Sequence, residues 1–172
     1  MRSLDTRLID TLAKMDHVRP ARDATGSPAL NAHALMDPSE TDNVDPVTQR
    51  MGFFLVPHFS MMALSSVTEP LRAANRVSGK PLYSWHLISV DGEPVSSSSG
   101  FALLPEFAIT SSPEFSHLFV VASIGVSDYR NAQVFDFLRR YAATGLTLGG
   151  ISLGTMILAR AGLLDRRRCT IH

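Results

Sequence analysis

The residues in this chain that could do chemistry centre on GISLG, residues 150–154, which is a G-x-S-x-G pattern. That pattern marks a nucleophile elbow, in which a serine occupies a sharp turn between a strand and a helix and small neighbours let the helix pack closely. Glycines on both sides of Ser152 supply that space. The backbone N–H groups of Leu153 and Gly154 would open the helix, so we expect them to form an anion or oxyanion site. Ser152 is therefore either a catalytic nucleophile or a serine at a position where another residue did the chemistry.

A catalytic triad of the α/β-hydrolase kind does not fit around Ser152. Such an enzyme needs an acid and then a histidine after the serine, both delivered by later strands. Only 20 residues follow Ser152, and the sole candidates among them are Asp165 and His172. Asp165 comes just after the helix that Ser152 begins, about a helix length away at roughly 1.5 Å per residue. The sequence therefore excludes an α/β-hydrolase.

Apolar runs and stretches of helical spacing alternate along the second part of the chain. The predicted strands cover residues 52–57, 83–90, 117–123 and 146–151, and the predicted helices cover 61–78, 131–145 and 154–162. Pro70 is expected to kink or restart the first helix near Thr68. Asp91-Gly92 is expected to open a hairpin toward residues 101–105, and Cys169–His172 to begin another strand. This strand–helix–strand repetition predicts a parallel sheet with helices on both faces.

Three of the predicted strands end in small or polar residues. In open parallel sheets, ligands bind outside the carboxyl ends of the strands, near the topological switch point. The expected ligand-binding residues are His58, Phe59 and Ser60, then Ser123, Ile124 and Gly125, then Ser152, Leu153 and Gly154. His58 is either a pocket residue or an exposed turn histidine.

Several other side chains have both a functional and a structural interpretation. Glu69 could balance the charge of a cationic ligand, but a solvated salt bridge with an arginine of the same helix is favoured. Phe59, Phe101 and Trp85 could form an aromatic site for a quaternary ammonium group, although Trp85 is favoured as a core residue.

Four further positions are predicted to be structural. Met61 and Met62 are expected to be packing residues and Cys169 a buried small residue. The run Arg166–Arg168 is expected to face solvent.

Composition excludes several classes of protein. The chain has 16 basic and 16 acidic residues, so no overall charge draws it to nucleic acid or to a membrane. Its apolar runs are far shorter than the roughly 20 residues needed to cross a bilayer. The single cysteine excludes an internal disulfide and a cysteine-built zinc site. We expect a cytoplasmic protein that uses neither a cofactor nor a metal.

Residues 1–50 differ in character from residues 51–172. An apolar stripe consistent with one short amphipathic helix consists of Leu4, Leu8, Ile9, Leu12 and Met15. The rest of the first segment is rich in Pro, Asp, Ser and Asn and buries too little apolar area to offset its ordering entropy. We therefore predict a flexible N-terminal extension over residues 1–50 and a globular domain over residues 51–172.

Two long stretches resemble a known family. GGISLGTMILARAGLLDRRRCTIH and GFFLVPHFSMMALSSVTEPLRAANRVSGKPLYSWHLISVDG resemble the class I glutamine amidotransferase-like domain of the PfpI type. They are most similar to the sensory domain of AraC-family transcriptional regulators of the GlxA type, which control glycine betaine, carnitine and arginine catabolism. The resemblance covers residues 51–172. It implies a flavodoxin-like α/β fold that is incomplete at its C-terminus. It also implies that DNA is bound only through a helix-turn-helix domain, which is absent from this chain.

The resemblance places the family's nucleophilic cysteine at Ser152 and its histidine at His172. Serine has a far higher pKa than cysteine and needs a strong neighbouring base. The family's enzymes also carry a carboxylate early in the first helix, whereas this chain has none there before Glu69. We therefore predict a homodimeric, non-catalytic sensor of a small amino-acid or quaternary-ammonium metabolite. Two alternatives stay open: a PfpI-like hydrolase or deglycase using Ser152 and His172, and a degenerate fragment without independent function.

Overall fold

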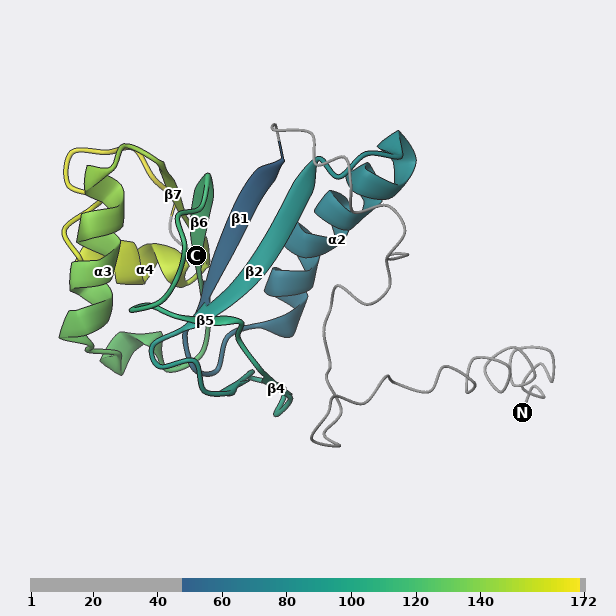
Figure 1. Cartoon of the computed structure of the whole chain (residues 1–172). Coiled ribbons are helices and arrows are strands. Elements are labelled where there is room, and N and C mark those ends of the chain that lie inside the picture. The colour runs from purple at the N-terminus through teal and green to yellow at the C-terminus, as the bar shows by residue number, and fades with distance from the viewer. Residues whose placement is uncertain (1–47, 171–172) are drawn as a thin grey trace, which may run out of the picture. The chain divides into compact units, whose positions relative to one another are not determined.

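The computed structural model describes residues 48–170, which are built around a parallel β-sheet (Figure 1). Its strands are β1 (Gln49–Leu55), β2 (Tyr83–Ser89), β5 (Phe107–Ala108), β6 (His117–Ala122) and β7 (Thr147–Ser152). They lie in the order β5-β2-β1-β6-β7, and every neighbouring pair is parallel. Without the short edge strand β5, the order is second, first, third, fourth along the chain, as in flavodoxin-like sheets. The predicted flavodoxin-like α/β fold is confirmed.

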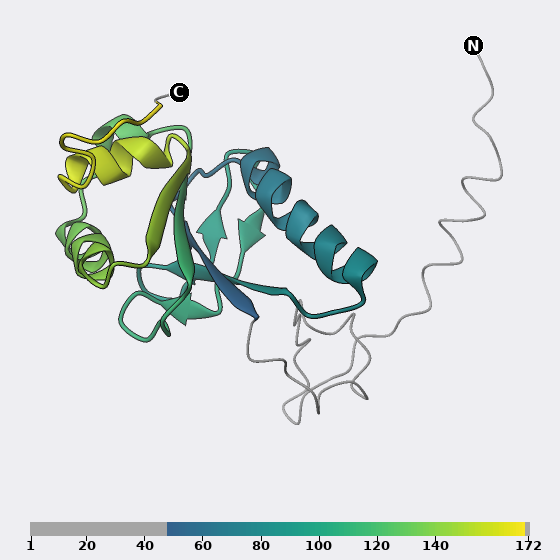
Figure 2. The ribbon, with the colours of Figure 1, turned by 90° about the horizontal axis from the view of Figure 1, so that it is seen from above.

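Helices cover both faces of this sheet. The helix α2 (Met61–Ser78) lies on one face, and α3 (Ala132–Ala143) and α4 (Gly154–Arg160) lie on the other (Figure 1, Figure 2). A single 3₁₀ turn, η3 (Val126–Asp128), joins β6 to α3. This arrangement confirms the predicted sheet with helices on both faces.

The hydrophobic core accordingly has two layers, and β1 contributes to both. Phe53 and Leu55 pack with Leu64 of α2, whereas Phe54 packs with Leu138 of α3 on the opposite face. Successive side chains of a strand point to opposite faces, so a strand covered on both sides must be apolar throughout. This is why the first strand reads as a continuous apolar run.

The long helix α2 begins and ends where the sequence predicts. The Oγ of Ser60 accepts a hydrogen bond from the N–H of Ala63 at 3.2 Å and caps the helix. Gly79 ends it with a left-handed φ of 65°. The predicted restart at Pro70 is wrong, because α2 continues through this residue without interruption. Pro70 and Ser66 are both exposed, so the Ser66 carbonyl that loses its helical partner stays in contact with water.

The short elements between β2 and β6 were only partly predicted. A hairpin is present in this region and consists of β3 (Val95–Ser96) paired antiparallel with β4 (Ala102–Leu103). The predicted turn at Asp91-Gly92 is wrong: the hairpin turns at residues 97–101, and Asp91-Gly92 connects β2 to β3. The edge strand β5 was not predicted, since two residues carry too little periodic signal. The strand β1 begins at Gln49, three residues earlier than predicted, because its pairing with β2 starts at Gln49 and Tyr83.

Further predictions need correction or lie beyond the described residues. Cys169 is exposed and not buried, and neither Cys169 nor Thr170 lies in a strand. Met62 is 81% exposed, because it lies on the outer side of the first turn of α2. The predicted N-terminal helix and His172 lie outside the described residues. Within residues 48–170, no helix is long and apolar enough to cross a membrane.

The closest approach between a helix and the sheet occurs at Gly154. A Cβ atom at this position would lie 1.9 Å from the carbonyl oxygen of Val120, a backbone atom that no side-chain movement can displace. We expect Gly154→Ala to lower the free energy of unfolding by more than about 3 kcal/mol, the upper range for overpacking. Urea unfolding followed by circular dichroism would measure this loss.

Gly79→Ala is the matched control for this substitution. Gly79 has a positive φ but open space around it, so alanine there meets backbone strain alone and should cost about 1 kcal/mol. Equal losses at the two positions would contradict a steric role for Gly154.

Candidate functional site

The carboxyl ends of β1, β6 and β7 meet at one edge of the sheet. In the parallel ladders Leu55 is paired with Val121, and Ala122 is paired with Ser152. The N–H of Val56 extends the first ladder by donating to the carbonyl of Val121 at 3.0 Å. The turns that follow these three strands therefore start side by side, around the point where strand order reverses.

Ser152 occupies a strained turn between β7 and α4. Its φ is 54°, in the left-handed region that residues other than glycine rarely adopt. A Cβ at Gly150 would lie 2.5 Å from the backbone nitrogen of Thr155, so the helix starts directly over the strand that precedes it. The predicted strand-to-helix elbow with small neighbours is confirmed.

The predicted pair of N–H donors at this elbow needs correction. The N–H of Leu153 donates to the carbonyl oxygen of Ala122 at 3.1 Å, so it serves the ladder between β6 and β7. Leu153 is half-buried and packs against the core on the α3 and α4 side. The expected oxyanion site made by Leu153 and Gly154 is therefore not formed in this structure.

Two of the three predicted residues in the turn after β1 are accessible to solvent. His58 is exposed and has a φ of 63°, and Ser60 is half-buried as the cap of α2. The side chain of Phe59 is fully buried in the core on the α2 side, so the structure does not bring it to a ligand.

The β3–β4 hairpin is attached directly to this turn. The N–H of His58 donates to the carbonyl of Ser96 at 2.7 Å, and the N–H of Ser98 donates to the carbonyl of Phe59 at 2.8 Å. Two backbone hydrogen bonds thus hold the hairpin beside the strand ends and cover Phe59. The sequence did not predict that the hairpin pairs with the turn after β1, because the residues joined by these hydrogen bonds lie about forty positions apart in the chain.

The turn after β6 is held by a residue that sequence reasoning missed. Ser123 is half-buried, Ile124 is 67% exposed and Gly125 has a φ of 77°. The guanidinium of Arg160, at the end of α4, donates to the carbonyl oxygens of Val126 and Ser127. Arg160 therefore fixes the start of η3 relative to the elbow. A lone arginine in a short helix gives no sequence signal for such a contact.

The hydroxyl group of Tyr129, the residue that follows η3 in the sequence, is buried. Burial raises the pKa of the Tyr129 hydroxyl to about 12, so the group stays protonated at neutral pH. Its Oη is buried and has no hydrogen-bond partner among residues 48–170.

The other candidate ligand-binding side chains either form structural contacts or are exposed at the surface. Arg72 donates to a carboxylate oxygen of Glu69 at 2.9 and 2.7 Å, and this hydrogen bond lowers the pKa of Glu69. The predicted salt bridge on α2 is confirmed. Trp85 packs half-buried against the α2-side core, as predicted, and Phe101 is 69% exposed on the hairpin.

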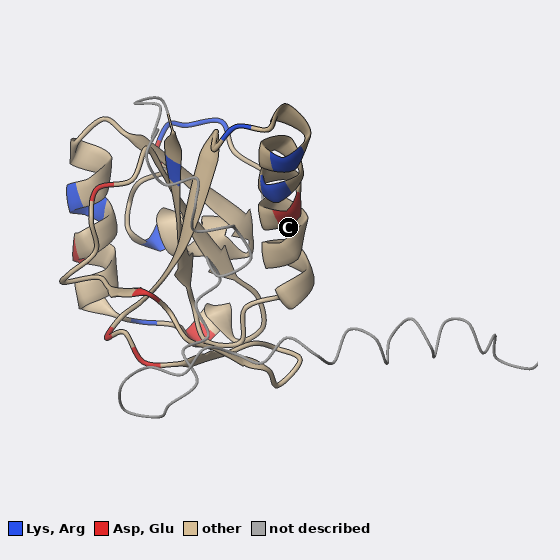
Figure 3. Ribbon diagram, turned by 45° about the vertical axis from the view of Figure 1, so that its right-hand side comes forward, with Lys and Arg blue, Asp and Glu red and all other residues tan. Residues whose placement is uncertain are grey.

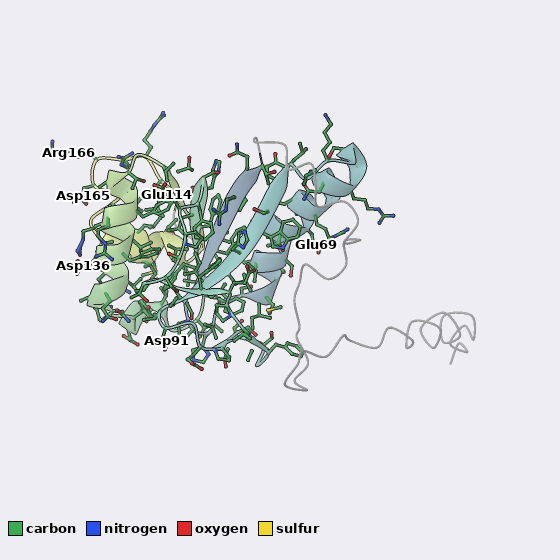
Figure 4. All side chains as sticks on the ribbon, in the orientation of Figure 1. Glu69, Asp91, Glu114, Asp136, Asp165 and Arg166 are labelled. Atoms are coloured by element: carbon green, nitrogen blue, oxygen red, sulfur yellow. The ribbon has the colours of Figure 1, made fainter. Side chains whose placement is uncertain are left out.

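Acidic side chains lie near this edge of the sheet. Asp91, which Figure 4 labels, and Glu93 follow β2, and Asp128 ends η3. The carboxylate of Asp91 accepts a hydrogen bond from the N–H of Glu93 at 3.1 Å, which orders the loop. In the described part of the chain, no three His, Cys, Asp or Glu side chains are placed to hold a metal ion.

Comparison with known proteins gives consistent matches. The DJ-1/PfpI family matches residues 54–172. The HTH-type transcriptional regulator GbdR of Pseudomonas aeruginosa is 37% identical over 124 residues, which are 72% of this chain and 34% of the regulator. The HTH-type transcriptional regulator CdhR of the same species is 41% identical over 126 residues, 73% of this chain and 37% of the regulator. The chain thus spans about a third of the length of these regulators.

An enzyme and a solved structure also match. Isonitrile hydratase of Pseudomonas putida is 29% identical over 124 residues, 72% of this chain and 52% of the enzyme. The crystal structure of an AraC family transcriptional regulator from Pseudomonas putida superposes with a TM-score of 0.65 and 30% identity. It covers 72% of this chain and 66% of that one.

The positive φ of Ser152 generates a test of strain at the elbow. We expect Ser152→Gly to be more stable to unfolding than Ser152→Ala by about 1 kcal/mol, because glycine adopts the left-handed region without a Cβ penalty. Both substitutions remove the hydroxyl, so their difference isolates the backbone term. Urea unfolding of the two variants measures it.

Ser66 provides a control at which the order of stability should be reversed, with the alanine variant more stable than the glycine variant. It lies inside α2, where glycine is about 1 kcal/mol worse than alanine. If alanine were also the more stable residue at position 152, the elbow would not be strained.

Proposed function

The chain belongs to the DJ-1/PfpI family and its homologues include HTH-type transcriptional regulators, and from this we propose that residues 51–172 form a ligand-sensing regulatory domain. The domain binds a small amino-acid or quaternary-ammonium metabolite at the carboxyl edge of the sheet and does not convert it. The observation that carries this proposal is Ser152, a hydroxyl placed at a strained elbow where a nucleophile would need an acid and a base.

The chemistry of the elbow supports binding over catalysis. A serine hydroxyl attacks a carbon atom only when a neighbouring base removes its proton. The first turn of α2, which the structure describes in full, carries no carboxylate, and Glu69 lies on the same helix paired with Arg72. A hydroxyl without such partners still donates and accepts hydrogen bonds, which suits the recognition of a polar ligand.

The surroundings of the elbow favour a ligand that carries positive charge and methyl groups. Asp91 and Asp128 contribute negative charge near this edge, and the exposed side chains of Ile124 and Phe101 contribute apolar surface. Carboxylates attract a cation, and an aromatic face attracts an alkylated ammonium group. Within this site we assign ligand contact to His58, Ser60, Ser123 and Ser152, with backbone contributions from the turns after β1 and β6.

A complete regulator would also need a DNA-binding domain and a partner subunit. We place sequence-specific DNA recognition in a helix-turn-helix domain of the kind that the names of the homologues describe, and expect a homodimer. A regulator that must reach DNA is expected to work in the cytoplasm.

The competing function is hydrolysis. The match to isonitrile hydratase of Pseudomonas putida supports a catalytic alternative in general, because that enzyme has a similar domain and adds water to its substrate. On this alternative, Ser152 would act as nucleophile together with His172.

Ligand binding predicts a rise in thermal stability. Glycine betaine, carnitine or arginine at saturating concentration should raise the melting temperature by roughly 5 °C or more, since a ligand at 100 times its Kd adds about 2.7 kcal/mol to the native state. Differential scanning fluorimetry of the 172-residue chain measures the shift. Ser152→Ala should reduce it, whereas Ser66→Ala, on the outer face of α2, should leave it unchanged. No shift with any of the three metabolites would favour the degenerate fragment.

A non-catalytic elbow predicts an absence of turnover. The chain should hydrolyse amides and esters, hydrate isonitriles and release glyoxal adducts no faster than Ser152→Ala does. Product formation followed by chromatography over several hours measures both proteins. Turnover by the unaltered chain that disappears in Ser152→Ala would establish the hydrolase instead.

A further inference from the structure

The amino edge of the sheet, opposite the proposed ligand site, gathers exposed basic side chains. They are Arg50, Arg76, Lys80, Arg140, Arg166, Arg167 and Arg168. Figure 3 shows blue segments along the upper edge of the domain and several red segments along the lower edge. We call these seven residues the basic edge.

The fold explains why residues so far apart in sequence share one edge. Helices that connect parallel strands run back to the amino edge, so the last turns of α2 and α3 place Arg76 and Arg140 there. Arg50 lies at the start of β1, and Lys80 lies in the connection from α2 to β2.

The segment after α4 reaches the same edge along α3. The Nε of Arg139, in α3, donates to the carbonyl of Ala161 at 3.3 Å and holds the start of this segment against the helix. Figure 4 shows Arg166 and Asp165 beside α3, on the side where that helix ends.

The cations of the basic edge are not neutralised within residues 48–170. The ion pairs formed there are Arg72 with Glu69, Arg139 with Asp136, and His86 with Glu106, and none involves the basic edge. The guanidinium of Arg50 lies 5.7 Å above the ring of Phe115, a contact that leaves its charge available. The acidic side chains on this side are Glu114 and Asp165, fewer than the cations around them (Figure 4).

The sequence predicts DNA contact only through a helix-turn-helix domain, because the net charge of the chain is zero, but net charge does not show a local cluster of cations. We propose that the basic edge binds the phosphate backbone of double-stranded DNA, independently of base sequence. Six of its seven cations are arginines, whose planar guanidinium groups match phosphate oxygens with paired hydrogen bonds. DNA is the polyanion that a transcriptional regulator meets, so the choice of partner rests on the regulatory role proposed above. The acidic carboxyl edge orients the domain, because repulsion turns the ligand site away from the phosphates.

Salt-dependent binding tests this proposal directly. The 172-residue chain is titrated into a fluorescein-labelled 24-base-pair duplex of arbitrary sequence, and anisotropy is recorded between 50 and 200 mM NaCl. We expect binding that weakens steeply with salt and is equal for two unrelated sequences, since neutralised phosphates release counterions. No binding at 50 mM NaCl, or binding to one sequence only, overturns the proposal.

Matched variants locate the surface. Arg167→Gln/Arg168→Gln should lower the slope of log Kd against log salt by about 1.8, at about 0.9 for each phosphate that the variant no longer neutralises. Arg76→Gln/Lys80→Gln tests the same edge from a different segment and should act in the same direction. Arg72→Gln/Arg130→Gln removes two charges outside the basic edge and should leave the slope unchanged. Arg166 is left unaltered because of its positive φ of 59°. Edge variants that bind with the slope of the unaltered chain overturn the proposal.

A competitor distinguishes DNA from an acidic protein. Unlabelled duplex should displace the probe, whereas poly-glutamate at the same concentration of charge should displace it far less. Equal displacement would assign the basic edge to an acidic polypeptide and overturn the proposal. These titrations contain no metabolite, so a chain that binds DNA without responding to any ligand would separate this proposal from the sensing function.

Discussion

The contact between α4 and the backbone of β6 is the constraint on which the arrangement of the site depends. Gly154 lies so close to the Val120 carbonyl that a Cβ would be 1.9 Å from its oxygen, and Gly150 lies similarly tightly under Thr155. With the helix held at this distance, the chain has only Ser152 and Leu153 in which to turn. The left-handed φ of Ser152 and the hydrogen bond from Leu153 to Ala122 both follow from this short connection. Packing of glycines, and not the serine side chain, determines the elbow.

The parallel topology has an electrostatic consequence at the scale of the domain. The strands β1, β2, β6 and β7 start at one edge of the main sheet and end at the other, and the helices α2 and α3 return the chain from β1 to β2 and from β6 to β7. Loops after strands therefore collect at the carboxyl edge, whereas helix ends and strand starts collect at the amino edge. Cations are favoured at helix C-termini, where the helix dipole is negative, and this favours Arg76 and Arg140 where they lie. Although the whole chain has no net charge, most of the exposed cations of its described domain gather at the amino edge.

Much of the fold could be predicted from sequence because its signals are local. Continuous apolar runs indicate strands covered on both faces, and Ser60, Gly79 and Asn131 mark helix ends through contacts within three or four residues. The turn at Ser152 was predictable for the same reason. The partners of that turn were not, since the Leu153 N–H is engaged by a strand about thirty residues earlier. Phe59 shows the same limit: it follows a strand and suggests a surface loop, but a distant hairpin covers it.

The separation of elbow geometry from elbow chemistry explains how one domain can serve enzymes and sensors alike. In a nucleophile elbow the strained backbone presents the side chain to the cavity, and the surrounding acid and base make that side chain reactive. Here the glycine packing that produces the strain is present, while a carboxylate in the first turn of α2 is not. The strained backbone therefore still presents a polar group, the hydroxyl of Ser152, at the carboxyl edge of the sheet. A hydroxyl held rigidly in this way loses little entropy when it binds a ligand, because the fold has already fixed its position. Strain that would prepare a nucleophile for attack can equally preorganise a receptor.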